Sequence, residues 1–259
     1  MQQHLTDIAD AIEAARRQHR AIPPLTDELP DLALADSVAV QRHNVRRRIA
    51  DGDRLVGYKL GNIAKVMQEA FGIDQPDYGH LLAGDFLLEN RPVHLDRFIE
   101  PFAEVEPAFL LKGRLEGPNV TVADVIRATE YVLPAVEIID SRFTDWRIQI
   151  ADTLADNGSV GGIVLGTTPR TLSEIDFSTM HGSLRYDDEE VGSGSASAVL
   201  GNPIAAIAWV CNELSQYGIA FEPGHVILPG SCLEAVPLKR AATVTAEFNG
   251  LGRVQFEAV

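Results

Sequence analysis

Two carboxylates stand two residues apart in an otherwise apolar stretch, PFAEVEPAFLL, at residues 101–111. This stretch predicts a buried β-strand, and strand side chains alternate between faces, so Glu104 and Glu106 project from the same face. Two like charges on a half-buried face repel each other and lose hydration, so they require a compensating positive charge. A divalent cation would supply it. The alternative is that both glutamates lie on the solvated face of an edge strand.

A third glutamate lies in a second apolar stretch, PAVEIIDSRF, at residues 134–143. Glu137 stands there between Val136 and Ile138, and a carboxylate in such surroundings is costly unless it is paired or bound to a metal. Three carboxylates without a nearby Cys or His ligand pattern suit a hard cation, Mg²⁺ or Mn²⁺, rather than zinc.

Other polar residues that could take part in chemistry lie in apolar or turn-like surroundings. Lys59 is in the middle of LVGYKLGN, residues 55–62, and either extends to the surface or projects into a site that holds an anion. Asp77 lies in GIDQPDYGHLL, residues 72–82, which we expect to be a structured loop. Its carboxylate either caps a turn or faces a substrate. His80, a lone histidine in the same segment, is expected to have a structural role.

The segment DSRFTDWRIQIADTLADNGSVGG, residues 140–162, is rich in side chains able to make directed hydrogen bonds. This density is typical of a loop that forms a site, although a surface loop can have the same composition.

The composition restricts the class of protein. The chain has 259 residues and a net charge of −15, which argues against nucleic acid or an anionic membrane as partner. The N-terminal stretch is charged and amphipathic, without the apolar core of a signal peptide, and no segment offers about 18 uninterrupted apolar residues. We therefore expect a soluble, cytoplasmic protein. Two cysteines do not suggest a disulfide framework.

The order of predicted elements favours an α+β protein, because helices are followed by strands without regular βαβ alternation. Residues 1–54 are expected to form an N-terminal helical region, and residues 55–259 a mixed-sheet or barrel-like catalytic body. The turn and capping signals predict five helices. These cover the first 20 residues before a proline-rich linker, then residues 36–50 with Asp36 as N-cap, the stretch from Asn62 to Gly72, residues 121–132 with a Thr121 and Asp124 capping box, and the stretch from Asn202 to Gly218.

Several common catalytic motifs are missing from the sequence. It has no Walker loop, no GxSxG nucleophile elbow, no HExxH and no GxGxxG fingerprint, and GSGSAS at residues 192–197 indicates a flexible turn. The interpretation that remains is acid–base chemistry around a hard metal ion.

The motifs also follow one another as in a known family. The chain from about Leu25 onward resembles the 2-hydroxypenta-2,4-dienoate (2-keto-4-pentenoate) hydratases, which are grouped with the 4-oxalocrotonate decarboxylases in the fumarylacetoacetate hydrolase superfamily. The matching segments are VGYKLG (56–61), DQPDYGHLL (74–82), EVEPAFLL (104–111), PAVEIIDSR (134–142), DWRIQIADTLADNGS (145–159) and ILPGS (227–231).

The resemblance implies particular roles for these residues. It implies that Mg²⁺ or Mn²⁺ is held by Glu104, Glu106 and Glu137, in agreement with the strand argument above. It further implies a substrate pocket lined by Lys59 and Asp77, with Ser159 nearby. The family's body is a mixed β fold of the fumarylacetoacetate hydrolase C-terminal type preceded by helices, and its members form homo-oligomers.

The implied function is a metal-dependent hydratase of aromatic meta-cleavage catabolism. It would add water to 2-hydroxypenta-2,4-dienoate, or a substituted analogue, to give 4-hydroxy-2-oxopentanoate. One alternative is the family's decarboxylase, which acts on 2-oxohex-3-enedioate, although residues 145–159 look more like those of the hydratases. Another is an acylpyruvate-type carbon–carbon hydrolase, which would need a His–Glu pair. A third is a subunit that mainly organises a complex with a pathway enzyme.

Overall fold

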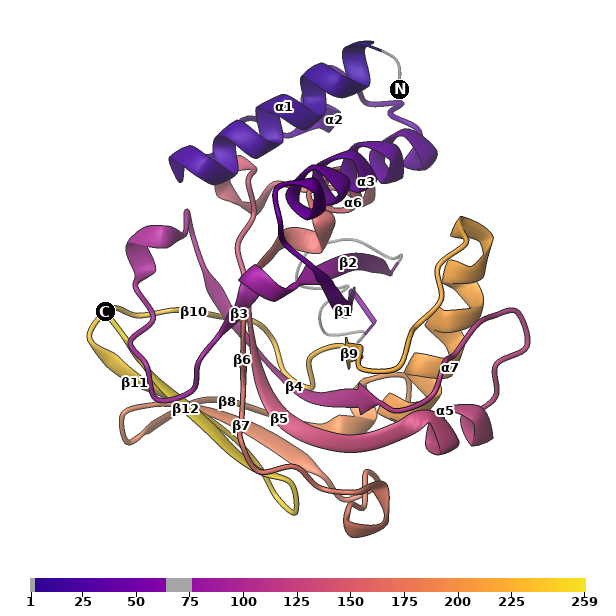
Figure 1. Cartoon of the computed structure of the whole chain (residues 1–259). Coiled ribbons are helices and arrows are strands. Elements are labelled where there is room, and N and C mark those ends of the chain that lie inside the picture. Colours follow the sequence, from indigo (N-terminus) through magenta and orange to yellow (C-terminus); the bar gives the residue numbers. More distant parts are fainter. Residues whose placement is uncertain (1–2, 64–75) are drawn as a thin grey trace.

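The computed structural model describes residues 3–63 and 76–259 (Figure 1). The predicted order is confirmed, because N-terminal helices are followed by strands that have further helices among them. The helices of the described part are α1 (Gln3–Gln18), α2 (Leu25–Glu28), α3 (Leu34–Ala50), α5 (Val122–Ala128), α6 (Ile150–Ala155) and α7 (Pro203–Leu214). Its strands are β1 (Leu55–Gly61), β2 (Asp77–Leu82), β3 (Phe86–Leu87), β4 (Phe102–Leu111), β5 (Thr129–Ile139), β6 (Val160–Leu165), β7 (His181–Tyr186), β8 (Glu189–Ser195), β9 (Val226–Leu228), β10 (Val236–Pro237), β11 (Ala242–Phe248) and β12 (Gly252–Ala258).

The N-terminal helices form a layer at the top of Figure 1, above α6. Helix α1 buries Leu5, Ala9 and Ile12, which recur at helical spacing on one face. Helix α3 begins at Leu34, so the prediction of Asp36 as N-cap is wrong. Asp36 instead lies in the first turn, where a negative charge is favoured by the helix dipole.

The proline-rich linker is not wholly extended, because α2 interrupts it. Thr26 of this short helix donates its backbone N–H and its hydroxyl to the two carboxylate oxygens of Asp152, at 3.1 and 2.6 Å. The linker therefore docks on α6, the helix that also contacts α3.

The strands of the large sheet lie in the order β2-β1-β9-β4-β5-β6-β3, with β10 beside β4, as far as the described residues go. Strands β4 and β5 are antiparallel in the middle of this curled sheet, and their register places Glu104 directly opposite Glu137. Strand β1 runs parallel to β9 and antiparallel to β2, with Lys59 opposite Gly79.

The prediction of a loop over residues 72–82 is wrong for Asp77–Leu82, which form the buried strand β2. The glycine at position 79 is explained by packing and not by a loop. A Cβ at this position would lie 2.3 Å from the carbonyl oxygen of Asn157, so only glycine allows the 157–159 turn to approach the strand.

A second sheet, in the order β12-β11-β7-β8, lies below the first in Figure 1. The prediction of a flexible turn at residues 192–197 is also wrong, because Gly192–Ser195 belong to β8 and pair with β7. A Cβ at Gly194 would lie 1.9 Å from the carbonyl oxygen of Cys232. The main apolar core includes Phe109, Val136, Phe248 and Phe256.

Other boundaries follow the sequence signals with two exceptions. Helix α7 is capped by Asn202, and Gly218 adopts the left-handed conformation after a 3₁₀ turn, as predicted. Helix α5 has the predicted capping box but ends at Ala128, because β5 begins at the next residue. The polar 140–162 segment is not simply a loop, since it contains α6.

The fold class is confirmed as α+β, with a helical N-terminus and a mixed, curled sheet. The division at residues 54 and 55 stays a prediction, and the helix expected between Asn62 and Gly72 falls largely outside the described residues. Cys211 and Cys232 are buried free thiols, as expected. Among the residues that the structure describes, none of the helices combines the length and the apolar composition that a membrane span needs.

Candidate active site and metal centre

Three carboxylates meet where β4 and β5 pair. One oxygen from each of Glu104, Glu106 and Glu137 lies within 4.8 Å of the others. The three side chains are buried, and Glu106 and Glu137 have no exposed surface. Strand β4 is flanked by β5 on one side and by β9 and β10 on the other, so the alternative of a solvated edge strand is wrong.

This carboxylate cluster requires a cation. Burial, together with the charge of Glu137, raises the pKa of Glu104 to about 8 and raises the pKa of Glu106 well above its ordinary value. Three adjacent buried carboxylates therefore do not all ionise at neutral pH unless positive charge is brought between them.

The hydrogen bonding of the cluster fits a metal ion. Glu106 Oε2 accepts the backbone N–H of Gly230 at 2.7 Å. The other oxygen of Glu106 and both oxygens of Glu137 are buried and accept no hydrogen bond from the described residues. Buried oxygens without donors are costly, and an all-carboxylate set of this kind suits Mg²⁺.

Lys59 reaches the cluster from β1. It is 3% exposed, and its Nζ lies 3.5 Å from Glu137 Oε1 and 4.0 Å from Asp77 Oδ1. The alternative in which this lysine extends to the surface is therefore wrong. Burial lowers the pKa of Lys59, but the negative charges of Glu137, Asp77 and Glu104 outweigh it and leave the pKa above its usual value.

Asp77 begins β2 beside Lys59. Its Oδ2 accepts the hydroxyl hydrogen of Thr153 at 2.6 Å, while Oδ1 accepts no hydrogen bond from described residues. A Cβ at Gly61 would lie 2.0 Å from Asp77 Oδ1, so glycine at that position makes room for the carboxylate. No sequence pattern singles out Thr153, because its role depends on how α6 packs against β2.

Ser159 closes the pocket on the side of α6. It follows Asn157 and Gly158 in a turn in which all three residues have positive φ, between 56° and 63°. The Ser159 hydroxyl lies 3.4 Å from Asp156 Oδ2. One cavity is lined by Lys59, Asp77, Glu104 and Ser159 together with Gly61, Asn62, Ile139, Trp146, Ile148, Thr153 and Gly158. The structure thus brings together all six residues singled out from the sequence.

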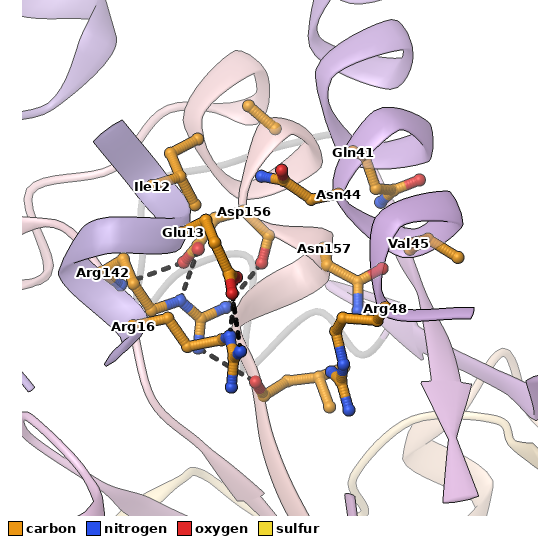
Figure 2. A pocket seen from close by; sticks show the side chains of 12 residues that line it. Ile12, Glu13, Arg16, Gln41, Asn44, Val45, Arg48, Arg142, Asp156 and Asn157 are labelled. Carbon is orange, nitrogen blue, oxygen red and sulfur yellow. Dashed lines mark hydrogen bonds and ion pairs between the residues drawn. The ribbon is translucent and has the colours of Figure 1, made fainter. Parts of the chain in front are cut away.

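A buried ion pair holds the turn that carries Ser159. Arg142 donates from Nε to Asp156 Oδ1, from Nη2 to the Asp156 carbonyl at 2.6 Å, and from Nη1 to the Val160 carbonyl at 2.9 Å. Figure 2 shows this pair in a pocket that Glu13 of α1 also lines. Since one guanidinium binds the chain on both sides of residues 157–159, it fixes the position of Ser159.

Replacing Thr153 by Val should lower kcat while leaving the fold intact. Valine has the same shape but leaves the carboxylate of Asp77 without its donor, and a hydrogen bond to a charged group is worth enough for a loss of about 10- to 100-fold. The Thr153→Ser variant keeps the hydroxyl and should stay near the wild-type rate. Steady-state kinetics of both variants test this, and equal rates for the two would show that the hydroxyl has no role.

His80 lies behind the site and is not part of the cavity. Its ring packs against those of Tyr58 and Tyr78 at centroid distances of 5.1 and 5.8 Å. Its backbone N–H donates to Asn157 Oδ1, and its carbonyl oxygen accepts a hydrogen bond from Asn157 Nδ2. These contacts support the predicted structural role. Burial lowers the pKa of His80 to about 4.

The free energy of unfolding should depend on pH because this imidazole is buried. As the pH falls below about 6.5, the unfolded chain binds a proton that folded His80 does not accept until about pH 4. The wild type should therefore lose about 3 kcal/mol of stability relative to His80→Gln between pH 7 and pH 4. Urea denaturation of both proteins at the two pH values measures this difference, and parallel losses would contradict it.

Comparison with known proteins identifies the class of fold. A decarboxylase structure, "4-oxalocrotonate decarboxylase from Pseudomonas putida G7 - complexed with magnesium and adipate", superposes with a TM-score of 0.95 at 30% identity over 100% of this chain and 98% of that one. Fumarylpyruvate hydrolase from Pseudomonas aeruginosa, at 13% identity and a TM-score of 0.61, shares the fold over 79% of this chain and 89% of that one. The protein thus has the fumarylacetoacetate hydrolase type of fold, with a carboxylate cluster in its centre.

Sequence relatives narrow this class to one family. A 2-hydroxyhexa-2,4-dienoate hydratase of Comamonas testosteroni is 39% identical over 92% of this chain and 91% of the relative. A 2-oxo-hept-4-ene-1,7-dioate hydratase of Escherichia coli is 36% identical over 96% of both. A scan against protein-family models found no match. The chain belongs to the 2-keto-4-pentenoate hydratase family, whose members are hydro-lyases.

Proposed function

We propose that this enzyme hydrates 2-hydroxypenta-2,4-dienoate, or a substituted analogue, to 4-hydroxy-2-oxopentanoate during meta-cleavage catabolism of aromatic compounds. The observation that carries the proposal is the buried cluster of Glu104, Glu106 and Glu137 beside Lys59 and Asp77, in a chain whose relatives are hydratases.

The three glutamates would hold the metal ion, with Mg²⁺ or Mn²⁺ as candidates. When bound, a divalent ion would stabilise the negative charge that develops on the C2 oxygen of a 2-oxo acid. Solved structures of the related decarboxylase contain magnesium or calcium, which supports a hard cation as the cofactor.

Lys59 and Asp77 would move the protons. The enol proton leaves the C2 hydroxyl and a proton is added at C5, which gives the 2-oxo-3-enoate. Water then adds across C3 and C4, with its oxygen on C4 and a proton on C3. The Lys59 ammonium can also anchor the substrate carboxylate, and Asp77, held by Thr153, can orient the water. Ser159 lines the cavity where its hydroxyl can bind the same substrate.

Two further parts of the proposal concern the enzyme as it occurs in the cell. We propose a homo-oligomer that acts in the cytoplasm and can associate with another enzyme of the pathway. The named relatives are bacterial catabolic enzymes that take small-molecule substrates, which supports the setting.

A decarboxylase is the second candidate, because the related decarboxylase superposes over the whole chain. It would use the same metal and the same stabilisation of an enolate to release CO₂ from 2-oxohex-3-enedioate. The acylpyruvate hydrolase alternative is less favoured, because no histidine of the described residues lines the cavity.

One experiment separates the two candidates. The purified enzyme with Mg²⁺ is given 2-hydroxypenta-2,4-dienoate and, in a second reaction, 2-oxohex-3-enedioate, while ultraviolet absorbance, products and CO₂ are followed. We expect the dienoate to be converted to 4-hydroxy-2-oxopentanoate without CO₂. Release of CO₂ from the diacid, with the dienoate left unchanged, would identify a decarboxylase instead.

A further inference from the structure

We infer that the cavity ends in an apolar wall formed by Ile139, Trp146 and Ile148, which selects substrates with a neutral apolar tail over dicarboxylates. This inference rests on the proposed function, since it concerns the part of the substrate that lies away from the reacting carboxylate.

The wall follows from the strand register. In the antiparallel pair of β4 and β5, Phe102 lies opposite Ile139 and Glu104 lies opposite Glu137, so the two pairs are two residues apart on each strand. Positions two apart on a strand share a face, so the apolar pair lies directly beside the acidic pair. A substrate whose carboxylate end is held at the glutamates can therefore extend along the strands towards an apolar surface.

Trp146 completes this surface and is held firmly in place. Its ring meets that of Phe102 edge-on at a centroid distance of 5.2 Å, and its Nε1 donates to the Glu100 carbonyl at 3.1 Å. Both Asp145 and Trp146 have positive φ, 58° and 52°, a backbone conformation that is costly for bulky residues and is often found at functional sites. Ile148 follows two residues later and lines the same cavity.

The charges of the cavity oppose a second substrate carboxylate. Among the described residues that line it, Lys59 is the only cation, and it already faces Glu137 and Asp77. The indole N–H of Trp146 is bonded to Glu100. A distal carboxylate would lose hydration against Ile139 and Ile148 without gaining a partner, whereas a methyl group would be favoured there.

The test compares a monoacid with a diacid of the same reaction class. With Mg²⁺ present, kcat/KM for 2-hydroxyhexa-2,4-dienoate should exceed that for 2-oxo-hept-4-ene-1,7-dioate by at least about 100-fold, as expected when a buried charge lacks a partner. The Ile148→Arg variant should reduce this ratio at least about 10-fold, because it brings a cation to the wall. Ile49→Arg, at an exposed isoleucine of α3 outside the cavity, is the matched control and should leave the ratio unchanged.

A binding measurement keeps this inference separate from the proposed function. Calorimetry with the unreactive acids 2-oxopentanoate and 2-oxohexanedioate should give the lower Kd for the monoacid, and Ile148→Arg should narrow the difference. If neither the monoacid nor the diacid substrate is hydrated but this binding preference holds, the proposed function is wrong and the inference about the apolar wall is supported. The inference would be overturned if the wild type converted and bound the diacids as well as the monoacids or better. It would also be overturned if the Ile148→Arg variant folded but changed neither the ratio of the kcat/KM values nor the ratio of the Kd values.

Discussion

Replacing Glu106 by Gln should abolish hydration and the binding of Mg²⁺. Glutamine has nearly the same shape but removes one of the three carboxylates that meet between β4 and β5. A bound ion contributes several kcal/mol to stabilising charge in the transition state, so kcat should fall by at least about 10³-fold. Turnover of 2-hydroxypenta-2,4-dienoate and calorimetric titration with Mg²⁺ measure the two effects.

Stability distinguishes loss of the metal site from loss of the fold. Burial raises the pKa of Glu106 because the charged form is disfavoured there, with the charges of Glu137 and Glu104 adding to the effect. In chelator, Glu106→Gln should therefore melt at the same temperature as the wild type or higher, whereas Mg²⁺ should raise the Tm of the wild type alone. Glu130→Gln, at an exposed position of β5, is the matched control and should behave as wild type. Normal turnover by Glu106→Gln would refute the predicted ligand set.

Replacing Lys59 by Met should lower kcat by about 10²- to 10⁴-fold, the range expected for a general acid–base group. Methionine keeps much of the length of the side chain but has no proton to give and no charge for the substrate carboxylate. The exposed Lys112→Met variant should keep the wild-type rate. Steady-state kinetics measures the loss, and a kcat within about twofold of the wild type would exclude Lys59 from the proton transfers.

The two variants should differ in metal binding. Lys59 lies 3.5 Å from Glu137, so its ammonium competes with a cation for the same carboxylate. Its removal should leave the affinity for Mg²⁺ unchanged or higher, while Glu106→Gln should lose it. Loss of Mg²⁺ binding in a folded Lys59→Met protein would contradict this division of roles.

Much of the site could be predicted from the sequence, because strand periodicity places Glu104 and Glu106 on one face and an apolar run makes Glu137 conspicuous. The pattern left open whether that face was solvated. The register does not follow from local sequence, and only the pairing of Glu104 with Glu137 shows that the carboxylates meet. The positions of Lys59, Asp77 and Ser159 in the pocket came from the family resemblance.

Two of the errors in the fold have the same physical cause. Gly79 and Gly194 lie in segments that were predicted to be a structured loop and a flexible turn, but both glycines are in strands, where another part of the backbone approaches too closely for a Cβ. Such a requirement comes from residues distant in the chain, Asn157 and Cys232, so no local pattern reveals it. The same holds for Thr153, which matters only because α6 brings its hydroxyl to Asp77.

The most direct test of the metal-dependent site measures bound Mg²⁺ and turnover on the same sample. Protein treated with chelator is dialysed against increasing concentrations of Mg²⁺, and each sample is assayed with 2-hydroxypenta-2,4-dienoate. We predict no turnover without the ion, one ion bound per chain at saturation, and a rate of 4-hydroxy-2-oxopentanoate formation proportional to occupancy. Full turnover by metal-free protein, or saturation with Mg²⁺ without any hydration, would contradict it.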